Sequence, residues 1–334
     1  MSGTSTPLLS VEGLKKYYPV RGGVFGAKIG DVRAVDGVSL TVMPGETLGL
    51  VGESGCGKST LGRAIMRLEE PTGGRVLFEG KDIASANKGE LFKLRRELQI
   101  IFQDPYSSLN PRMTVGEIVR EPLLVHGIGN KSQQREKVRA LMQTVGLTGE
   151  MLDRYPHEFS GGQRQRIGIA RALALNPKLV IADEPVSALD ISVRSQVLNL
   201  MSKLQREFKL TYVFISHDLS VVEHVSDSIA IMYLGRIVET GPAEIVFSRP
   251  AHPYTRALMA AIPVPDPELR RESAPIKGET PSPVSPPSGC PFHPRCSYAI
   301  EACKSTVPLL EPVSSGGESG LRPHLAACIR KHEI

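Results

Sequence analysis

The sequence feature that most constrains the fold is a glycine-rich loop after an apolar segment. Residues 47–51 have the composition of a buried strand, and the loop GESGCGKS follows at 52–59. In a loop of this pattern, glycines let backbone N–H groups surround phosphates, a lysine reaches the terminal ones and a serine binds Mg²⁺. Residues 59–68 have a helical pattern, so that helix's dipole would favour the phosphates. This order predicts a nucleotide-binding α/β fold.

The loop supplies most of the expected contacts with the nucleotide. The residues predicted to bind nucleotide are Gly52, Ser54, Gly55, Cys56, Gly57, Lys58, Ser59 and Thr60, and Ser59 would also bind Mg²⁺. Cys56 is expected only to be compact, although an exposed thiol beside a lysine could in principle be reactive.

A second apolar segment, 179–182, ends in two carboxylates, Asp183 and Glu184. In phosphate-loop enzymes, the first of two such groups can hold Mg²⁺ and the second can orient the attacking water. Expected strands at 47–51, 99–102, 179–182 and 211–216, with helices at 90–98, 162–175 and 192–209, indicate a parallel sheet covered by helices. Residues 8–49 are expected to form short strands, interrupted by a glycine-containing loop at 21–31. Residues 104–160 are expected to be a helical insertion, with helices at 115–126 and 132–145.

Composition and charge narrow the class of protein. The 334 residues include 41% apolar residues, enough for a buried core, and carry 40 basic and 35 acidic residues mixed along the chain. The mixing gives no indication of a nucleic-acid partner. We find no signal peptide at residues 1–14 and no apolar run long enough to span a membrane. The chain is therefore expected in the cytoplasm, contacting membranes only through partners.

The C-terminal part has a different composition. Residues 263–289 are rich in proline, which predicts a semi-rigid linker, and residues 290–334 contain Cys290, Cys296, Cys303 and Cys328. In a reducing compartment, such clustering favours a metal site over disulfides. Their spacing leaves five, six and 24 residues between successive cysteines, which is loose for a zinc ribbon. Four thiolates suit a [4Fe–4S] cluster; zinc, or no metal, remains an alternative.

Residues 159–164, FSGGQR, lie between the phosphate loop and the paired carboxylates. This segment resembles the signature motif of ABC ATPases, a family in which ATP lies between two such domains. Physically, Ser160 and the glycines would open a helix whose N–H groups can bind the γ-phosphate held by the other subunit. The residues assigned to this contact are Ser160, Gly161, Gly162 and Gln163.

The resemblance extends to three further motifs. Gln103 is similar to the family's Q-loop residue, Asp190 in 187–190 to its D-loop, and His217 to its switch histidine. The resemblance implies that Gln103 senses Mg²⁺, that His217 contacts the γ-phosphate and water, and that Glu184 is the catalytic base. Asp183 would bind Mg²⁺ with Ser59 and Gln103, and Asp190 would couple two ATP sites.

An aromatic residue near the N-terminus would complete the nucleotide site. Tyr18 resembles the residue that stacks on adenine in this family, and a π face explains the need for an aromatic without strict base selectivity. The neighbouring Tyr17 could serve instead.

The segments at 252–258 and 289–296 resemble the C-terminal extension of oligopeptide and dipeptide importers. The resemblance implies an ABC nucleotide-binding domain at 1–262, comprising a β subdomain and the inserted helical one, and a small module at 290–334 whose four cysteines hold an iron–sulfur cluster. It further implies two membrane permeases, a second homologous ATPase, an extracytoplasmic substrate-binding protein, and a position at the cytoplasmic face of the inner membrane. The cargo could instead be nickel or glutathione; a soluble ABC ATPase or a redox-responsive binding module is less well supported.

Overall fold

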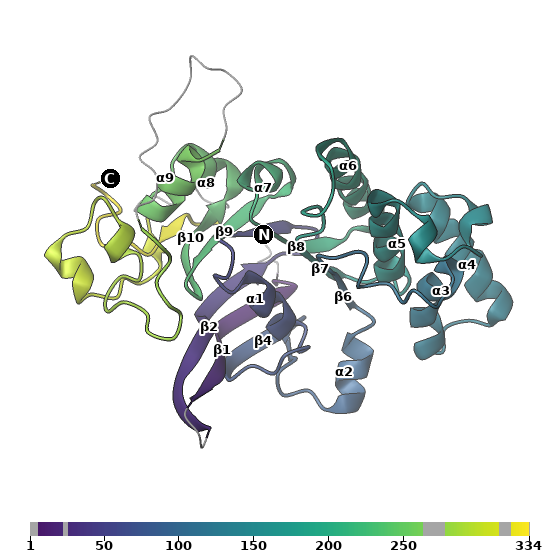
Figure 1. Cartoon of the computed structure of the whole chain (residues 1–334), viewed down its shortest axis with the longest axis horizontal. Coiled ribbons are helices and arrows are strands. Elements are labelled where there is room, and N and C mark those ends of the chain that lie inside the picture. The colour runs from purple at the N-terminus through teal and green to yellow at the C-terminus, as the bar shows by residue number, and fades with distance from the viewer. Residues whose placement is uncertain (1–5, 23–25, 263–277, 314–321, 334) are drawn as a thin grey trace, which may run out of the picture. The chain divides into compact units, whose positions relative to one another are not determined.

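The computed structural model describes residues 6–22, 26–262, 278–313 and 322–333. The chain forms two compact units. Among the described residues, the first comprises 43–46 and 85–215, and the second comprises 6–22, 26–42, 47–84, 216–262, 278–313 and 322–333. Figure 1 labels the helices and many of the strands of the two units.

The second unit contains a four-stranded antiparallel sheet in the order β2-β1-β4-β5. Its strands are β1 (Leu9–Gly22), β2 (Ala27–Val42), β4 (Gly73–Phe78) and β5 (Lys81–Asp82). We expected short strands and a loop at 21–31, but β1 and β2 are 14 and 16 residues long, and pairing continues to Gly22 opposite Ala27. The loop was overestimated because Gly30 pairs with Val20 as an ordinary strand residue.

The second unit also carries strands in the order β11-β12-β10-β9-β3. The fully buried β3 (Thr47–Val51) is parallel to β9 (Ser228–Tyr233), which forms a hairpin with β10 (Arg236–Pro242). Near the C-terminus, β12 (Leu325–Ala326) pairs with both β10 and β11 (Glu311–Pro312). The C-terminal segment is therefore joined to the sheet that carries the phosphate loop. The described part of this unit contains the helices α1 (Lys58–Ile65), α7 (Leu219–Val225), α8 (Ala243–Ser248) and α9 (Pro253–Ala260).

The first unit has three parallel strands in the order β8-β7-β6. These are β6 (Leu98–Ile101), β7 (Leu179–Asp183) and β8 (Thr211–Ser216), and all residues of β7 and β8 are buried. This burial explains their nearly continuous apolar sequences. The unit also contains α2 (Lys88–Leu94), α5 (Gly161–Leu173) and α6 (Ile191–Phe208), close to the expected helices.

The segment expected to be helical, 104–160, contains α3 (Val115–Val125) and α4 (Lys131–Thr144). Both helices begin with a capping box, formed by Thr114 with Glu117 and by Asn130 with Gln133. α3 packs against α4 and α5 through a buried apolar face. Two short 3-10 turns, Gly149–Met151 and Pro156–Glu158, lead into α5.

Only part of the proline-rich segment is described, since residues 263–277 lie outside the described ranges. Residues 278–289 are more than a linker, because the Pro283 carbonyl accepts a hydrogen bond from the Arg33 N–H of β2, at 3.2 Å. Two 3-10 turns, His293–Arg295 and Glu301–Lys304, follow in the cysteine-rich part. Among the described residues, no helix combines the length and apolar character needed to cross a membrane.

Candidate nucleotide and cysteine sites

The phosphate loop connects β3 with α1 in the second unit, as predicted. Two of its glycines are required by close backbone neighbours: a Cβ at Gly57 would lie 1.9 Å from the Ala34 carbonyl oxygen, and one at Gly52 would lie 2.2 Å from that of Met232. Gly57 also has φ +107°, a conformation that L-residues avoid. The loop pattern is thus required by the space around the backbone. Ser59 and Thr60 lie in the first turn of α1.

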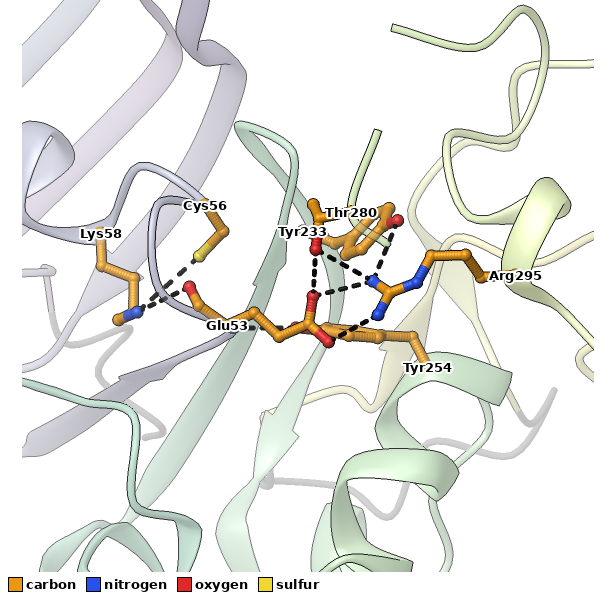
Figure 2. A network of polar contacts seen from close by, with 7 residues as sticks. All are labelled: Glu53, Cys56, Lys58, Tyr233, Tyr254, Thr280 and Arg295. Carbon is orange, nitrogen blue, oxygen red and sulfur yellow. Dashed lines mark hydrogen bonds and ion pairs between the residues drawn. The ribbon is translucent and has the colours of Figure 1, made fainter. Parts of the chain in front are cut away.

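Lys58 is the first residue of α1 and is 5% exposed. Its Nζ donates to the carbonyl oxygens of Gly52 and Glu53, at 2.8 and 3.0 Å, and lies 3.9 Å from Cys56 Sγ (Figure 2). The Lys58 side chain therefore lies along the phosphate loop. Burial raises the pKa of the Cys56 thiol, although Lys58 opposes the shift, so Cys56 stays protonated and acts as a compact packing residue.

Tyr17 and Tyr18 differ in what their side chains contact. The Tyr17 hydroxyl donates to Asp36, and its ring lies against the Arg33 guanidinium, 5.9 Å from the ring centroid. Tyr18 makes a cation–π contact with Lys16, whose Nζ is 4.8 Å from the ring centroid. Because Tyr17 is held by Asp36, which Arg236 also binds at 2.7 Å, Tyr18 is the better candidate for stacking on adenine.

His217 is also part of the second unit. It is exposed and follows β8 directly, in front of Asp218, whose carboxylate caps α7 by accepting from the N–H groups of Ser220 and Val221. The cap fixes the backbone that carries the histidine.

In the first unit, β7 ends at the two predicted carboxylates. Asp183 is 2% exposed, and Glu184 has φ +46°, the left-handed region that non-glycine residues rarely adopt. The Glu184 N–H donates to the Ile215 carbonyl at 3.0 Å, which holds this backbone against β8. Gln103, after β6, donates from Nε2 to Glu184 Oε2 at 2.8 Å. Two predicted catalytic residues, 81 positions apart, are therefore in direct contact.

The signature residues begin α5. Ser160 is its N-cap: Ser160 Oγ accepts from the Gln163 N–H at 3.4 Å, and Gln163 Oε1 accepts from the Ser160 N–H at 3.0 Å. Phe159, which precedes them, is 4% exposed and packs as an apolar residue. The exposed Ser160 and Gly161 leave the start of the helix accessible to a ligand.

The start of α5 also packs on the predicted D-loop. A Cβ at Gly162 would lie 2.3 Å from Val193 Cγ1 of α6, so glycine is needed at this helix crossing. Asp190 is the N-cap residue of α6, and Arg194 holds the preceding turn by donating to the Leu189 carbonyl at 2.7 Å. Signature motif and D-loop are thus neighbours within one unit.

The four C-terminal cysteines line one cavity, together with Phe292 and Tyr298. Burial, together with the nearby thiols of Cys303, Cys328 and Cys296, raises the pKa of Cys290 to about 11. The two histidines near the cysteines have other partners, since His293 Nδ1 lies 2.9 Å from the Cys290 carbonyl oxygen and His324 Nε2 lies 2.6 Å from Glu239 Oε1.

No metal-binding geometry is formed by these thiols. Across residues 6–22, 26–262, 278–313 and 322–333, no three or more His, Cys, Asp or Glu side chains are placed to hold a metal ion. The predicted grouping of the cysteines is seen, whereas neither an iron–sulfur cluster nor zinc is supported by their geometry.

Sequence reasoning missed one feature of the phosphate loop. The carboxylate of Glu53 binds Arg295, which lies between Cys290 and Cys296, at 2.8 Å. Little in the sequence indicated this contact, because the two residues are 242 positions apart and no local sequence pattern relates them.

Two family models match the chain. The model for "ABC transporter" matches residues 35–187, and that for "Oligopeptide/dipeptide transporter, C-terminal region" matches residues 238–303. Among curated proteins, the dipeptide transport ATP-binding protein DppF of Haemophilus influenzae is 56% identical, with 93% of this chain and 95% of that protein covered. The oligopeptide transport ATP-binding protein AppF of Bacillus subtilis is 54% identical, with 90% and 92% covered.

Solved structures give the same family resemblance. A dimeric ATP-binding cassette in a post-hydrolysis state, bound to ADP and phosphate, matches with a TM-score of 0.62 at 29% identity, covering 70% of this chain and 98% of that one. The cbiO1 protein of Clostridium perfringens, part of the ABC transporter complex cbiONQ, matches with a TM-score of 0.62 at 29% identity, covering 72% of this chain and 91% of that one.

Proposed function

This chain belongs to the ATP-binding subunits of the oligopeptide and dipeptide ABC transporter family. We propose that it drives peptide import by ATP hydrolysis, with Glu184 as the catalytic base. The contact between Gln103 and Glu184 is the observation that carries the catalytic assignment, because it places a carboxylate and a glutamine together at the ends of two parallel strands. A carboxylate fixed at a strand end can accept the proton of an attacking water.

Within the proposed site, each residue has a separate task. Lys58 and the N–H groups of the phosphate loop bind the phosphates, and Tyr18 stacks on adenine. The oxygen donors of Ser59, Asp183 and Gln103 suit Mg²⁺, which supplies charge neutralisation on the phosphates when bound. Glu184 accepts the proton of the attacking water, and His217 contacts the γ-phosphate.

The signature residues would act on ATP held by a second subunit. Ser160, Gly161, Gly162 and Gln163 lie at an accessible helix start, which suits contact with a γ-phosphate. Asp190 begins the helix that packs on this start, so a change at one ATP site can reach the other. The dimeric cassette to which this chain is similar supports such an arrangement.

We place the subunit at the cytoplasmic face of the inner membrane, bound to two permeases and a homologous second ATPase, with an extracytoplasmic binding protein supplying peptide. The test is affinity purification of the tagged chain from gently solubilised membranes, followed by mass spectrometry. Recovery of two permeases and a second ATPase is expected. Recovery of the chain alone, or with ribosomes or DNA-repair proteins, would contradict the importer assignment.

The cargo is proposed to be dipeptides or short oligopeptides, because the two similar curated proteins are named for dipeptide and oligopeptide transport. Nickel and glutathione are the alternatives. The binding protein that copurifies distinguishes them, since its affinity for dipeptides, nickel ions and glutathione can be measured directly.

We further propose that Cys290, Cys296, Cys303 and Cys328 hold an iron–sulfur cluster that stabilises the C-terminal module. The proposal rests on the resemblance of this segment to the importer extension and on the four thiols, since four thiolates are the usual ligand set of a [4Fe–4S] cluster. The four cysteines line one cavity, although among the described residues they are not placed to hold a metal ion. The chain's own part is to hold the four sulfur atoms around one space and to shield them with Phe292.

Removing one of these thiols should release the metal. We expect Cys303→Ser to lose most of the bound iron and acid-labile sulfide when the full chain is purified without oxygen, because one ligand is lost from the buried side of the cavity. Cys56→Ser, outside the module, should retain both. Zinc without sulfide in the wild-type chain would contradict the iron–sulfur assignment and support zinc, and a chain without metal would exclude both.

A further inference from the structure

The phosphate loop is tied to the C-terminal module by an ion pair. Arg295 donates two hydrogen bonds to the carboxylate of Glu53, from Nη1 to Oε2 at 2.8 Å and from Nη2 to Oε1 at 3.1 Å (Figure 2). Thr280 adds a third bond to the same carboxylate, donating from Oγ1 to Oε2 at 2.9 Å. Paired bonds between a guanidinium and a carboxylate fix direction as well as distance.

This ion pair is shielded from solvent. The Arg295 side chain is 8% exposed and that of Glu53 is 24% exposed. The guanidinium also lies against the ring of Tyr233, 5.8 Å from its centroid, which restricts the arginine further. Exposed ion pairs contribute little, but one that is shielded, bidentate and held by a third group can fix a loop.

A second contact holds the backbone of the same residue. The Glu53 N–H donates to the hydroxyl of Tyr254 at 2.9 Å, so this amide of the phosphate loop is held by the tyrosine. Tyr254 is 0% exposed, and its ring packs on Tyr233 and Phe292 with centroid distances of 4.7 and 5.3 Å. Because Phe292 belongs to the cysteine-rich part, this buried aromatic cluster fixes both the tyrosine and the module.

Glu53 therefore has the C-terminal segments on one side and the nucleotide-binding lysine on the other. Its side chain and N–H are held by Arg295 and Tyr254, while its carbonyl oxygen accepts from Lys58 Nζ at 3.0 Å. We propose that Arg295 and Tyr254 are positioning residues for ATP binding, which hold the phosphate loop through Glu53 in the conformation that receives the phosphates. The inference rests on the proposed binding of ATP at this loop.

The consequence is that the C-terminal module sets nucleotide affinity and not the rate of the chemical step. A preformed loop binds phosphate without the entropic cost of ordering its backbone. When the loop is no longer held by Arg295, binding includes that cost and the affinity falls. The described contacts of Glu53 include Lys58, which binds phosphate, but neither Glu184 nor His217, the residues assigned to the attacking water. Loss of the ion pair should therefore raise KM for ATP and leave kcat largely unchanged.

The test compares ATP affinity and turnover for variants of the full chain in the assembled transporter. Arg295→Met should weaken ATP binding about tenfold, while kcat at saturating ATP changes less than about twofold. Arg295→Lys should recover part of the affinity, since a lysine keeps the charge but not the fork. Tyr254→Phe retains the ring and removes only the hydroxyl, so it should weaken binding by a smaller factor without disturbing the core.

A double-mutant cycle separates positioning from general stability. Glu53→Gln should weaken ATP binding like Arg295→Met, and the double variant should be no worse than either single one, because both remove the same interaction. Lys304→Met is the control: it breaks the exposed 2.8 Å ion pair with Glu301 in the same module and should leave affinity unchanged.

Three results would overturn the proposal. These are unchanged ATP affinity in folded Arg295→Met, additive losses in the double variant, and lower thermal stability without an affinity change. If Arg295→Met does not fold, Tyr254→Phe and Glu53→Gln decide in the same way. If the wild-type chain binds no ATP, the proposed function itself is contradicted. If the wild type binds ATP and the variants bind it equally well, only the positioning role of Arg295 and Tyr254 is contradicted.

Discussion

Lys58→Ala is expected to weaken ATP binding by on the order of a hundredfold or more. The lysine is nearly fully buried and is held by the carbonyl oxygens of Gly52 and Glu53, so its Nζ is a fixed cation at the start of α1. Its removal takes away the charge proposed to bind the terminal phosphates and leaves two loop carbonyls without this donor. Titration of the purified full chain with a fluorescent ATP analogue measures the loss.

The control for this variant is Lys178→Ala, which breaks an exposed ion pair with Glu97 in the first unit and should bind ATP like the wild type. Equal affinity of Lys58→Ala and the wild type, with both folded, would show that the phosphates bind elsewhere. Such a result would remove the basis for all the contacts assigned to residues 52–60.

Glu184→Gln has the second large expected effect, about a thousandfold lower steady-state ATP hydrolysis with ATP binding retained. The amide of glutamine cannot accept the proton of the attacking water. It has nearly the same shape as the carboxylate and keeps an oxygen that can accept from Gln103 Nε2, which lies 2.8 Å from Glu184 Oε2 in the wild type. The loss should therefore lie in kcat and not in affinity. Phosphate release by the assembled transporter, measured beside nucleotide binding, separates the two.

Glu207→Gln is the matched control, since Glu207 is an exposed carboxylate of the same unit, 3.6 Å from Lys203 Nζ. An unimpaired hydrolysis rate for Glu184→Gln would contradict its role as the base. If both variants lost hydrolysis equally, the loss could not be assigned to proton transfer at Glu184.

Much of the local structure around the candidate nucleotide site could be predicted because its signals are local. The glycines of the phosphate loop, the apolar β7 with carboxylates at its end, and the serine that begins α5 each occupy a few adjacent residues. The chemistry of such a motif is set by its backbone, so the sequence predicts it without knowledge of the surroundings.

Element ends were less predictable because caps and single backbone conformations decide them. α2 was expected at 90–98 but spans 88–94, since Asn87 and Glu90 form a capping box that starts the helix earlier. α1 was expected to reach Leu68 but ends at Ile65, where Arg67 adopts φ +48° and cannot continue the helix.

Contacts between distant residues were not predictable. The pairing of β12 with β10 joins Leu325 to Thr240, and short strands such as Leu325–Ala326 have no periodic pattern of their own. The bond between Glu53 and Arg295 likewise depends on a fold that brings the C-terminal module to the phosphate loop. Only the packed structure contains this information.

The most direct test of the account is ATP-driven dipeptide uptake by the complete transporter, reconstituted in vesicles with its binding protein. We predict uptake that requires ATP and is abolished by Glu184→Gln in this subunit together with the equivalent change in its partner ATPase. Hydrolysis of ATP without uptake of dipeptides or oligopeptides, or uptake that persists when both bases are removed, would contradict the assignment of this chain as the motor of a peptide importer.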